Sequence, residues 1–143
     1  MLFSKICIAS DHAGFDLKEK IKVFLTNKDV PIIDLGPINK NSVDYPDYAK
    51  KVAKRLLLNK SDAGILVCGS GTGMAISANK FKNIRAAQCY NKKSTILSRQ
   101  HNNANIICLG SRMIDKKDAF NFIKFFFTTK FEGGRHKKRI NKI

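Results

Sequence analysis

The chain has 143 residues, of which 43% are hydrophobic, and a formal net charge of +16. This length can bury one sizeable core but is short for two, so we expect one domain over residues 1–143. No apolar run approaches the roughly 18 to 20 residues of a membrane span. Residues 2–8 are too short, and too soon followed by Ser10, Asp11 and His12, for a secretory signal. We therefore expect a cytoplasmic protein without membrane contact.

The basic charge suggests an anionic partner, and nucleic acid is the first candidate because basic proteins bind it by neutralising phosphates. The lysines, however, are spread along every predicted helix, and only residues 135–139 form a dense basic cluster. The chain has no helix-turn-helix, zinc-finger or aromatic-interleaved RNA signature. We expect no specific nucleic-acid partner, although a basic nucleic-acid-binding module stays open as an alternative of another class.

Five short apolar runs predict strands at residues 5–10, 31–35, 63–67, 85–89 and 105–109. They are continuous rather than alternating in polarity, which is typical of parallel strands covered on both faces. Apolar side chains at helical spacing lie between and after them: Phe15, Leu17, Ile21, Phe24 and Leu25; Tyr48, Val52 and Leu56; Ile96 and Leu97; and Phe120, Ile123, Phe126 and Phe127. This alternation predicts an α/β fold built from βαβ units around a five-stranded, mostly parallel sheet.

Polar clusters follow three of these strands, where the loops of parallel sheets gather around a crevice. Asp11 and His12 follow the first strand, residues 68–73 follow the third, and residues 110–112 follow the fifth. Residues 101–103 instead close the helix before the fifth strand, so their arrival at the crevice depends on tertiary or subunit contacts.

The third cluster is the most informative segment, because Gly69, Gly71 and Gly73 alternate in it. Such a loop can bring successive backbone N–H groups to an anion, and the helix predicted after it adds its positive end. A tight turn with no ligand is the plain alternative. A dinucleotide site is a second alternative, but the spacing is GxGxG, and no Asp or Glu lies near the position about 20 residues on.

Cys68 opens this loop, where backbone donors would favour its thiolate and suit it to act as a base or a nucleophile. The other cysteines, Cys7, Cys89 and Cys108, lie in or beside apolar runs, and we interpret them as reduced packing residues. No CxxC pair indicates a zinc site or a disulfide scaffold.

His12 and His101 are two of three histidines, and each lies among polar residues at the end of a predicted element. Together with Cys68 they indicate a functional site. We expect no metal centre, because neither these two nor His136 has an acidic partner at ligand spacing.

Arg135 and Arg139 are four residues apart, so on a helix they share one face and could hold one phosphate together. Gly133 and Gly134 permit a sharp turn that returns this tail to the body of the protein. The alternative is a solvated basic tail.

Seven motifs resemble, in order and spacing, the ribose-5-phosphate isomerase B and galactose-6-phosphate isomerase family over nearly the whole chain. These motifs are ASDHAG at residues 9–14, DYP at 44–46, CGSG at 68–71, ANK at 78–80, SRQHN at 98–102, GSR at 110–112 and EGGRH at 132–136. The resemblance implies a Rossmann-like three-layer α/β/α sandwich and no cofactor. It further implies a homodimer or a dimer of dimers with active sites shared between subunits.

By the same resemblance, the chain is an aldose–ketose isomerase of sugar phosphates. Cys68 is the base that moves a proton between C1 and C2, since Met74 and Ala75 stand where some relatives carry a glutamate base. Ser70, where many relatives have Thr, holds the developing oxyanion with the amides of Gly69, Gly71, Thr72 and Gly73. His101 is the acid that opens the furanose ring.

The remaining positions that match the family contact the substrate. Asp11 assists at the sugar, Asn102 hydrogen-bonds it, Tyr45 lines the pocket, and His12, Arg112, Arg135 and Arg139 bind the phosphate. The substrate this implies is ribose 5-phosphate, with galactose 6-phosphate or allose 6-phosphate as the nearest alternative. A thiol hydrolase that uses Cys68 and His101 is a more distant one.

Overall fold

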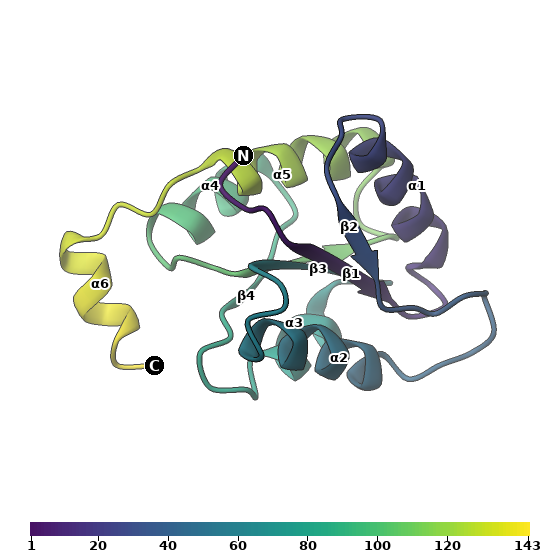
Figure 1. The fold of residues 1–143 in the computed structure, drawn as a ribbon, viewed down its shortest axis with the longest axis horizontal. Coiled ribbons are helices and arrows are strands. Elements are labelled where there is room, and N and C mark those ends of the chain that lie inside the picture. The colour runs from purple at the N-terminus through teal and green to yellow at the C-terminus, as the bar shows by residue number, and fades with distance from the viewer.

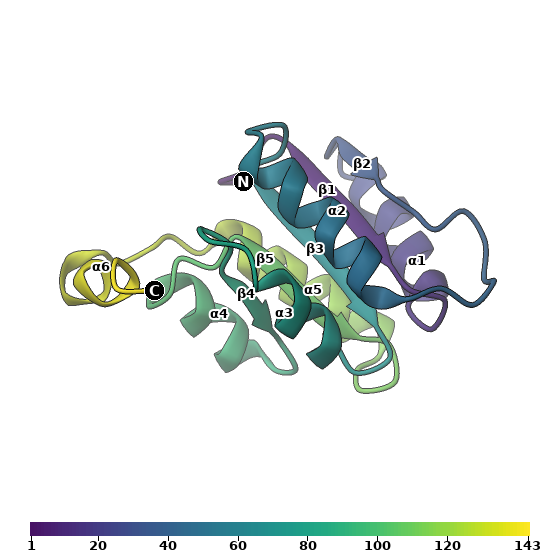
Figure 2. The ribbon, with the colours of Figure 1, turned by 90° about the horizontal axis from the view of Figure 1, so that it is seen from below.

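Five strands form one parallel sheet with the order β2-β1-β3-β5-β4 (Figures 1 and 2). The computed structural model describes residues 1–143. The strands are β1 (Ile6–Ser10), β2 (Ile32–Asp34), β3 (Ala63–Cys68), β4 (Ala86–Gln88) and β5 (Ile106–Gly110). The helices are α1 (Phe15–Thr26), α2 (Tyr45–Leu57), α3 (Thr72–Ala78), α4 (Lys92–Gln100), α5 (Lys116–Thr128) and α6 (Gly134–Ile140). None of these helices is long and apolar enough to cross a lipid bilayer.

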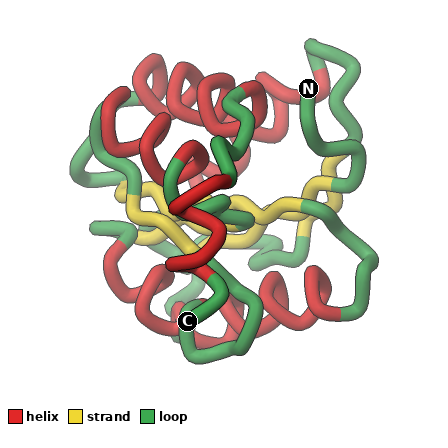
Figure 3. The backbone as a smooth tube through the Cα atoms, turned by 90° about the vertical axis from the view of Figure 1, so that its left-hand side faces the viewer, coloured by secondary structure: helices red, strands yellow, loops and turns green.

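The sheet is the middle of three layers, with helices on both of its faces (Figure 3). Helices α1, α4 and α5 lie on one face, and α2 and α3 lie on the other (Figure 1). All residues of β1, β3 and β5 are buried, which is the reason these strands read as continuous apolar runs. The predicted three-layer α/β/α fold with a five-stranded parallel sheet is confirmed.

The two edge strands are shorter than predicted. β2 covers three residues of the predicted five, and so does β4. Each has a strand neighbour on one side only and is partly exposed, so its outer residues lack the second ladder that extends the inner strands. The three inner strands match the prediction to within one residue at each end.

Helix α6 lies apart from the layers, beyond the end of α4 (Figures 1 and 2). The turn that leads to it uses Gly133 and Gly134, with φ values of +70° and +51°. A Cβ atom at either position would meet nothing within 4 Å, so the backbone conformation, rather than close packing, is what favours glycine here. Both the predicted turn and the predicted C-terminal helix are present.

Candidate active site

The carboxyl ends of β1 and β3 meet where the sheet order changes direction, because β1 lies between β2 and β3. In open parallel sheets this is the place where ligands bind. Asp11 follows β1 directly, its backbone N–H donates to the Val67 carbonyl at 3.1 Å, and its carboxylate accepts the Gly14 N–H at 2.9 Å. A Cβ atom at Gly14 would lie 2.4 Å from the Val67 oxygen, so this turn requires glycine. Asp11 is thus buried and fixed beside the end of β3.

Cys68 is the last residue of β3, and the glycine loop wraps around its sulfur. The Gly71 N–H donates to Sγ of Cys68 at 3.1 Å, a contact that a thiolate receives more strongly than a thiol. Gly71 has a φ of +81°, which turns its amide back toward the strand end. The Cys68 carbonyl accepts the Ser111 N–H at 2.8 Å, so the loop is also tied to the end of β5. This arrangement puts a thiol at the mouth of a loop of backbone donors.

Three polar side chains surround this loop. The Tyr45 ring lies against Gly73, where a Cβ atom would come within 2.7 Å of it, and the Arg112 guanidinium lies against Gly69, where a Cβ atom would come within 3.0 Å. The His12 ring nitrogen Nδ1 accepts the backbone N–H of Val43 at 3.2 Å, two residues before Tyr45. These contacts bring a phenol, a guanidinium and an imidazole to the side of the sheet formed by the carboxyl ends of its strands. We call this side the carboxyl edge, and the opposite side, formed by the amino ends, the amino edge.

Gln88, at the end of β4, is a neighbour of the loop that sequence reasoning missed. Its Nε2 donates to the Ser70 carbonyl at 3.0 Å and to the Thr72 hydroxyl at 2.9 Å. The Ser70 hydroxyl in turn accepts the Thr72 N–H at 3.2 Å. No sequence signal marks Gln88, because its contacts depend on the placement of β4 beside the loop.

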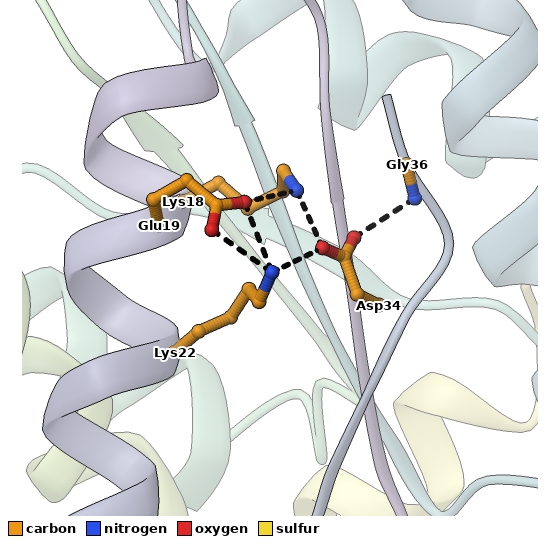
Figure 4. A network of polar contacts seen from close by, with 5 residues as sticks. All are labelled: Lys18, Glu19, Lys22, Asp34 and Gly36. Carbon is orange, nitrogen blue, oxygen red and sulfur yellow. Dashed lines mark hydrogen bonds and ion pairs between the residues drawn. The ribbon is translucent and has the colours of Figure 1, made fainter. Parts of the chain in front are cut away.

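A network of charged side chains, centred on the buried Lys18, lies near the ends of β1 and β2 (Figure 4). The Lys18 side chain is fully buried, and its Nζ contacts Asp34 at 2.6 Å and Glu19 at 2.7 Å, while Lys22 also contacts both carboxylates. Asp34 accepts the Gly36 N–H at 2.9 Å, and the Gly36 carbonyl accepts the N–H of Ser10, the residue before Asp11, at 3.0 Å. The network therefore ties α1 to the end of β2 and, through Gly36, to the end of β1.

His101 and Asn102 do not lie at this edge. They follow α4, and the Asn102 carbonyl accepts Nε of Arg85, just before β4, at 3.0 Å. They therefore lie beside the amino ends of β4 and β5. Since β5 has five residues, the two edges of the sheet are about 15 Å apart. Within one chain, the structure separates His101 and Asn102 from Cys68.

Arg135 and Arg139 lie on α6, one turn apart and exposed. Figure 2 shows α6 beyond α4, the helix that His101 caps. The glycine turn does return the tail to the body, but it does so near the end of α4 and not at the glycine loop. Glu132 marks this junction, since its N–H donates to the Gln100 carbonyl at 3.1 Å. The predicted site residues thus form two groups: one lies with Cys68 at the carboxyl edge of the sheet, and the other lies with His101 beyond the amino edge.

One cluster has the composition of a metal site. Ligand atoms of His101, Glu132 and His136 lie within 4.8 Å of one another, so the expectation that these histidines lack an acidic partner is wrong. The two imidazole rings are stacked, however, with centroids 4.1 Å apart and planes at 9°. A histidine binds zinc in the plane of its ring, whereas an ion at the usual 2.0 to 2.1 Å from a nitrogen of each stacked ring would lie between the two ring planes. The geometry is that of a ring stack rather than of a metal centre.

A family model described as Ribose/Galactose Isomerase matches residues 6–143. The chain belongs to this family. Ribose-5-phosphate isomerase B of Escherichia coli is 41% identical over 97% of this chain and 93% of its own length. The crystal structure of a ribose 5-phosphate isomerase from Thermotoga maritima has a TM-score of 0.96 at 51% identity, covering 97% of this chain and 96% of that one. A Mycoplasma genitalium ribose-5-phosphate isomerase B with bound ribulose-5-phosphate has a TM-score of 0.90 at 43% identity, covering 96% of this chain and 91% of that one.

Membership of the ribose/galactose isomerase family confirms the resemblance and the expected isomerase class. The separation of Cys68 from His101 argues against a thiol hydrolase within one chain. In one chain of this family member, His101 lies too far from Cys68 to act as its base.

Proposed function

We propose that the chain interconverts ribose 5-phosphate and ribulose 5-phosphate through an enediolate. The observation that carries this proposal is the position of Cys68, at the mouth of a loop whose Gly71 N–H donates to its sulfur at 3.1 Å. The names of the relatives from E. coli and T. maritima support the pentose substrate, and so does the ribulose-5-phosphate bound by the M. genitalium protein.

Cys68 acts as the base in this proposal. Isomerisation removes a proton from the carbon beside the carbonyl and returns it to the neighbouring carbon, and a general base positioned between the two carbons can do both. The sulfur accepts the Gly71 N–H, and Cys68 as a whole is 4% exposed, so the thiol is shielded from bulk water. Neither residue after Gly73, Met74 or Ala75, can replace it.

The enediolate oxygens carry negative charge that the loop can stabilise. The Ser70 hydroxyl and the backbone amides of residues 69–73 are the candidate donors, of which the Gly71 N–H contacts Cys68 directly. Preorganised donors of this kind stabilise a developing oxyanion without reorganising during the reaction. The Gln88 contacts to Ser70 and Thr72 favour this role, because they hold the loop in one conformation. Asp11, buried beside β3, is placed to orient the sugar.

We infer that a complete site needs two copies of the chain. Opening the furanose ring requires an acid at the ring oxygen, and His101, with Asn102 to bind the sugar, is the family's candidate for it. Since His101 lies at the opposite edge of the sheet from Cys68, a second copy must bring its own His101 to the first copy's crevice. In a two-fold symmetric dimer the same contact forms twice, which gives two equivalent sites.

The phosphate is held by residues from both copies in the same way. His12 and Arg112 lie at the crevice, whereas Arg135 and Arg139 are exposed on α6 and belong to the group that the second copy supplies. The two arginines lie one turn apart on α6 and can meet phosphate oxygens in charge-assisted hydrogen bonds. An anionic substrate is also consistent with the net charge of +16.

The test is a coupled assay of the purified chain with ribose 5-phosphate, with and without a chelator, and with galactose 6-phosphate in parallel. The proposal expects turnover of the pentose phosphate, weaker turnover of the hexose phosphate, and no effect of the chelator. Turnover of the hexose phosphate alone would overturn the substrate, and activity lost with the chelator would overturn the metal-free mechanism.

A further inference from the structure

Helix α6 touches the body of the protein through one buried side chain. Of the residues in α6, only His136 is buried, and its side chain is 7% exposed. The helix carries Arg135 and Arg139, which the proposed function uses to bind phosphate. The packing contact of His136 therefore helps to position these two arginines.

The His136 ring packs against the His101 ring. The two rings are stacked, with centroids 4.1 Å apart and planes at 9°. Nε2 of His136 is buried and has no hydrogen-bond partner, and it faces Oε2 of Glu132 at 3.6 Å. The same carboxylate oxygen lies 4.0 Å from Nε2 of His101. Both distances exceed those of direct hydrogen bonds, so Glu132 lies near both rings without bonding to either.

The surroundings of His136 favour its neutral form. Burial lowers the pKa of His136, the positive charges of His101, Arg135 and Arg139 lower it further, and only Glu132 opposes them. His136 is therefore neutral near pH 7. A neutral aromatic ring can lie against His101 in either of its charge states, and it attracts an imidazolium over its face. A protonated His136 would instead repel a protonated His101.

We propose that His136 is a positioning residue for His101: its ring stacks on the His101 imidazole and fixes the orientation in which that imidazole serves the site of a second copy. This inference rests on the proposed function, because it assumes that His101 opens the sugar ring. Ring opening depends on the direction of a proton transfer, so a shift of the imidazole by about 1 Å can cost on the order of 100-fold in rate.

The test compares His136→Phe, which keeps a flat ring in the stack, with His136→Leu, which does not. Lys137→Ala and Lys138→Ala on the same helix are the controls. Two substrates are used: ribose 5-phosphate, and its 4-deoxy analogue, which lacks the hydroxyl that closes the ring. Activity on the analogue is measured as exchange of its C2 proton with deuterated solvent.

We expect His136→Leu to lower kcat for ribose 5-phosphate by about tenfold to a hundredfold and exchange on the linear analogue by less than about threefold. His136→Phe and the two lysine variants should stay within about threefold on both substrates. Equal losses of His136→Leu on both substrates would mean that His136 only anchors α6 and its arginines. Unchanged kcat in His136→Leu would also overturn the proposal.

A second readout does not depend on activity. The chain has three histidines, so their imidazole C2–H signals can be assigned in proton NMR spectra with single substitutions. The His101 signal should move downfield in His136→Leu, because the ring current of the stack is lost, and should remain upfield in His136→Phe. If this shift occurs but the wild-type chain does not isomerise ribose 5-phosphate, the proposed function fails while the contact stands. If the His101 signal does not move, the stack itself is absent.

Discussion

Cys68 and His101 lie at opposite ends of the strands of one sheet. Cys68 is at the carboxyl end of β3, and His101 is beside the amino ends of β4 and β5. The strand length between these edges corresponds to about 15 Å. No rotation of either side chain closes such a gap. A reaction that uses both residues at one substrate therefore needs two chains.

Replacing Cys68 by Ala should abolish isomerisation and leave the inhibition constant of a non-reacting phosphorylated sugar acid within several-fold of the wild-type value. The base acts in the transition state, whereas the inhibitor measures the grip on phosphate and sugar. Cys68→Ser should be nearly as poor, because a hydroxyl is far less acidic than a thiol. Cys89→Ala, which alters another buried thiol, is the control and should remain active. Near-normal turnover of Cys68→Ala would exclude Cys68 as the base.

His101→Asn should lose activity on ribose 5-phosphate but retain proton exchange on an analogue that cannot close its ring. The reason is that His101 serves ring opening, a step that a linear substrate does not need. Steady-state assays and deuterium exchange measure the two activities. Similar losses on both substrates would remove His101 from ring opening.

Replacing either Arg135 or Arg139 by Ala should weaken binding of a phosphorylated inhibitor by roughly 1.5 to 3 kcal/mol, as expected for a hydrogen bond to a charged group. Lysine at either position should rescue binding only in part, because it keeps the charge but not the planar fork. The unphosphorylated inhibitor should bind the wild type and these variants alike.

Lys137→Ala and Lys138→Ala are matched controls for the arginines, since both side chains are exposed on the same helix. Each should change the inhibition constant by less than about 0.5 kcal/mol. If all four substitutions had the same effect, α6 would be a solvated basic segment, and His12 and Arg112 would hold the phosphate with the glycine loop.

The network around Asp34 predicts a loss of stability in acid. Burial alone would raise the pKa of Asp34, but hydrogen bonds from Lys18, Lys22 and the Gly36 N–H together lower it below its ordinary value of 3.8. A carboxyl whose pKa is lower in the folded chain stabilises the fold above its unfolded pKa and loses this contribution as the pH falls through the folded value. The free energy of unfolding, measured with urea, should therefore fall as the pH drops below about 4. Asp34→Asn should reduce this fall; an unchanged pH dependence would contradict the prediction.

Lys18 and Lys22 contact the same two carboxylates but differ in burial, with side chains that are 0% and 29% exposed. Lys18→Met should lower the free energy of unfolding at pH 7 by about 1.5 to 3 kcal/mol, because it removes the buried cation that faces both carboxylates. Lys22→Met should cost less than about 1 kcal/mol, as for a partly exposed pair. Equal effects would show that burial does not set the strength of this network.

Sequence patterns predicted the inner strands well because β1, β3 and β5 are buried on both faces, which leaves a continuous apolar run. They overextended β2 and β4, whose ends depend on having a strand on one side only. The order of the last two strands was not predictable, because it is a long-range pairing that local patterns do not encode.

The same limit applies to the candidate site. Asp11, Cys68 and Arg112 lie at or just after the carboxyl ends of β1, β3 and β5, which share one edge, so the fold class predicts that they are close together. The contacts of Gln88 with the loop and of His136 with His101 join segments far apart in sequence or across a glycine turn, and no local pattern indicates them. Glu132 is separated from His136 by the glycine turn, so the sequence alone does not indicate that these two side chains meet.

If each site combines Cys68 of one chain with His101 of another, two inactive variants should complement each other when they are mixed. Cys68→Ala and His101→Asn are purified separately, mixed in equal amounts, dissociated with mild denaturant and reassociated, and then assayed with ribose 5-phosphate. Half of the randomly reassociated dimers are hybrids, and each hybrid has one site with both wild-type residues. We therefore expect the mixture to recover about a quarter of wild-type activity. If both residues of a site came from one chain, every hybrid site would lack one of them, and the mixture would stay as inactive as its parents.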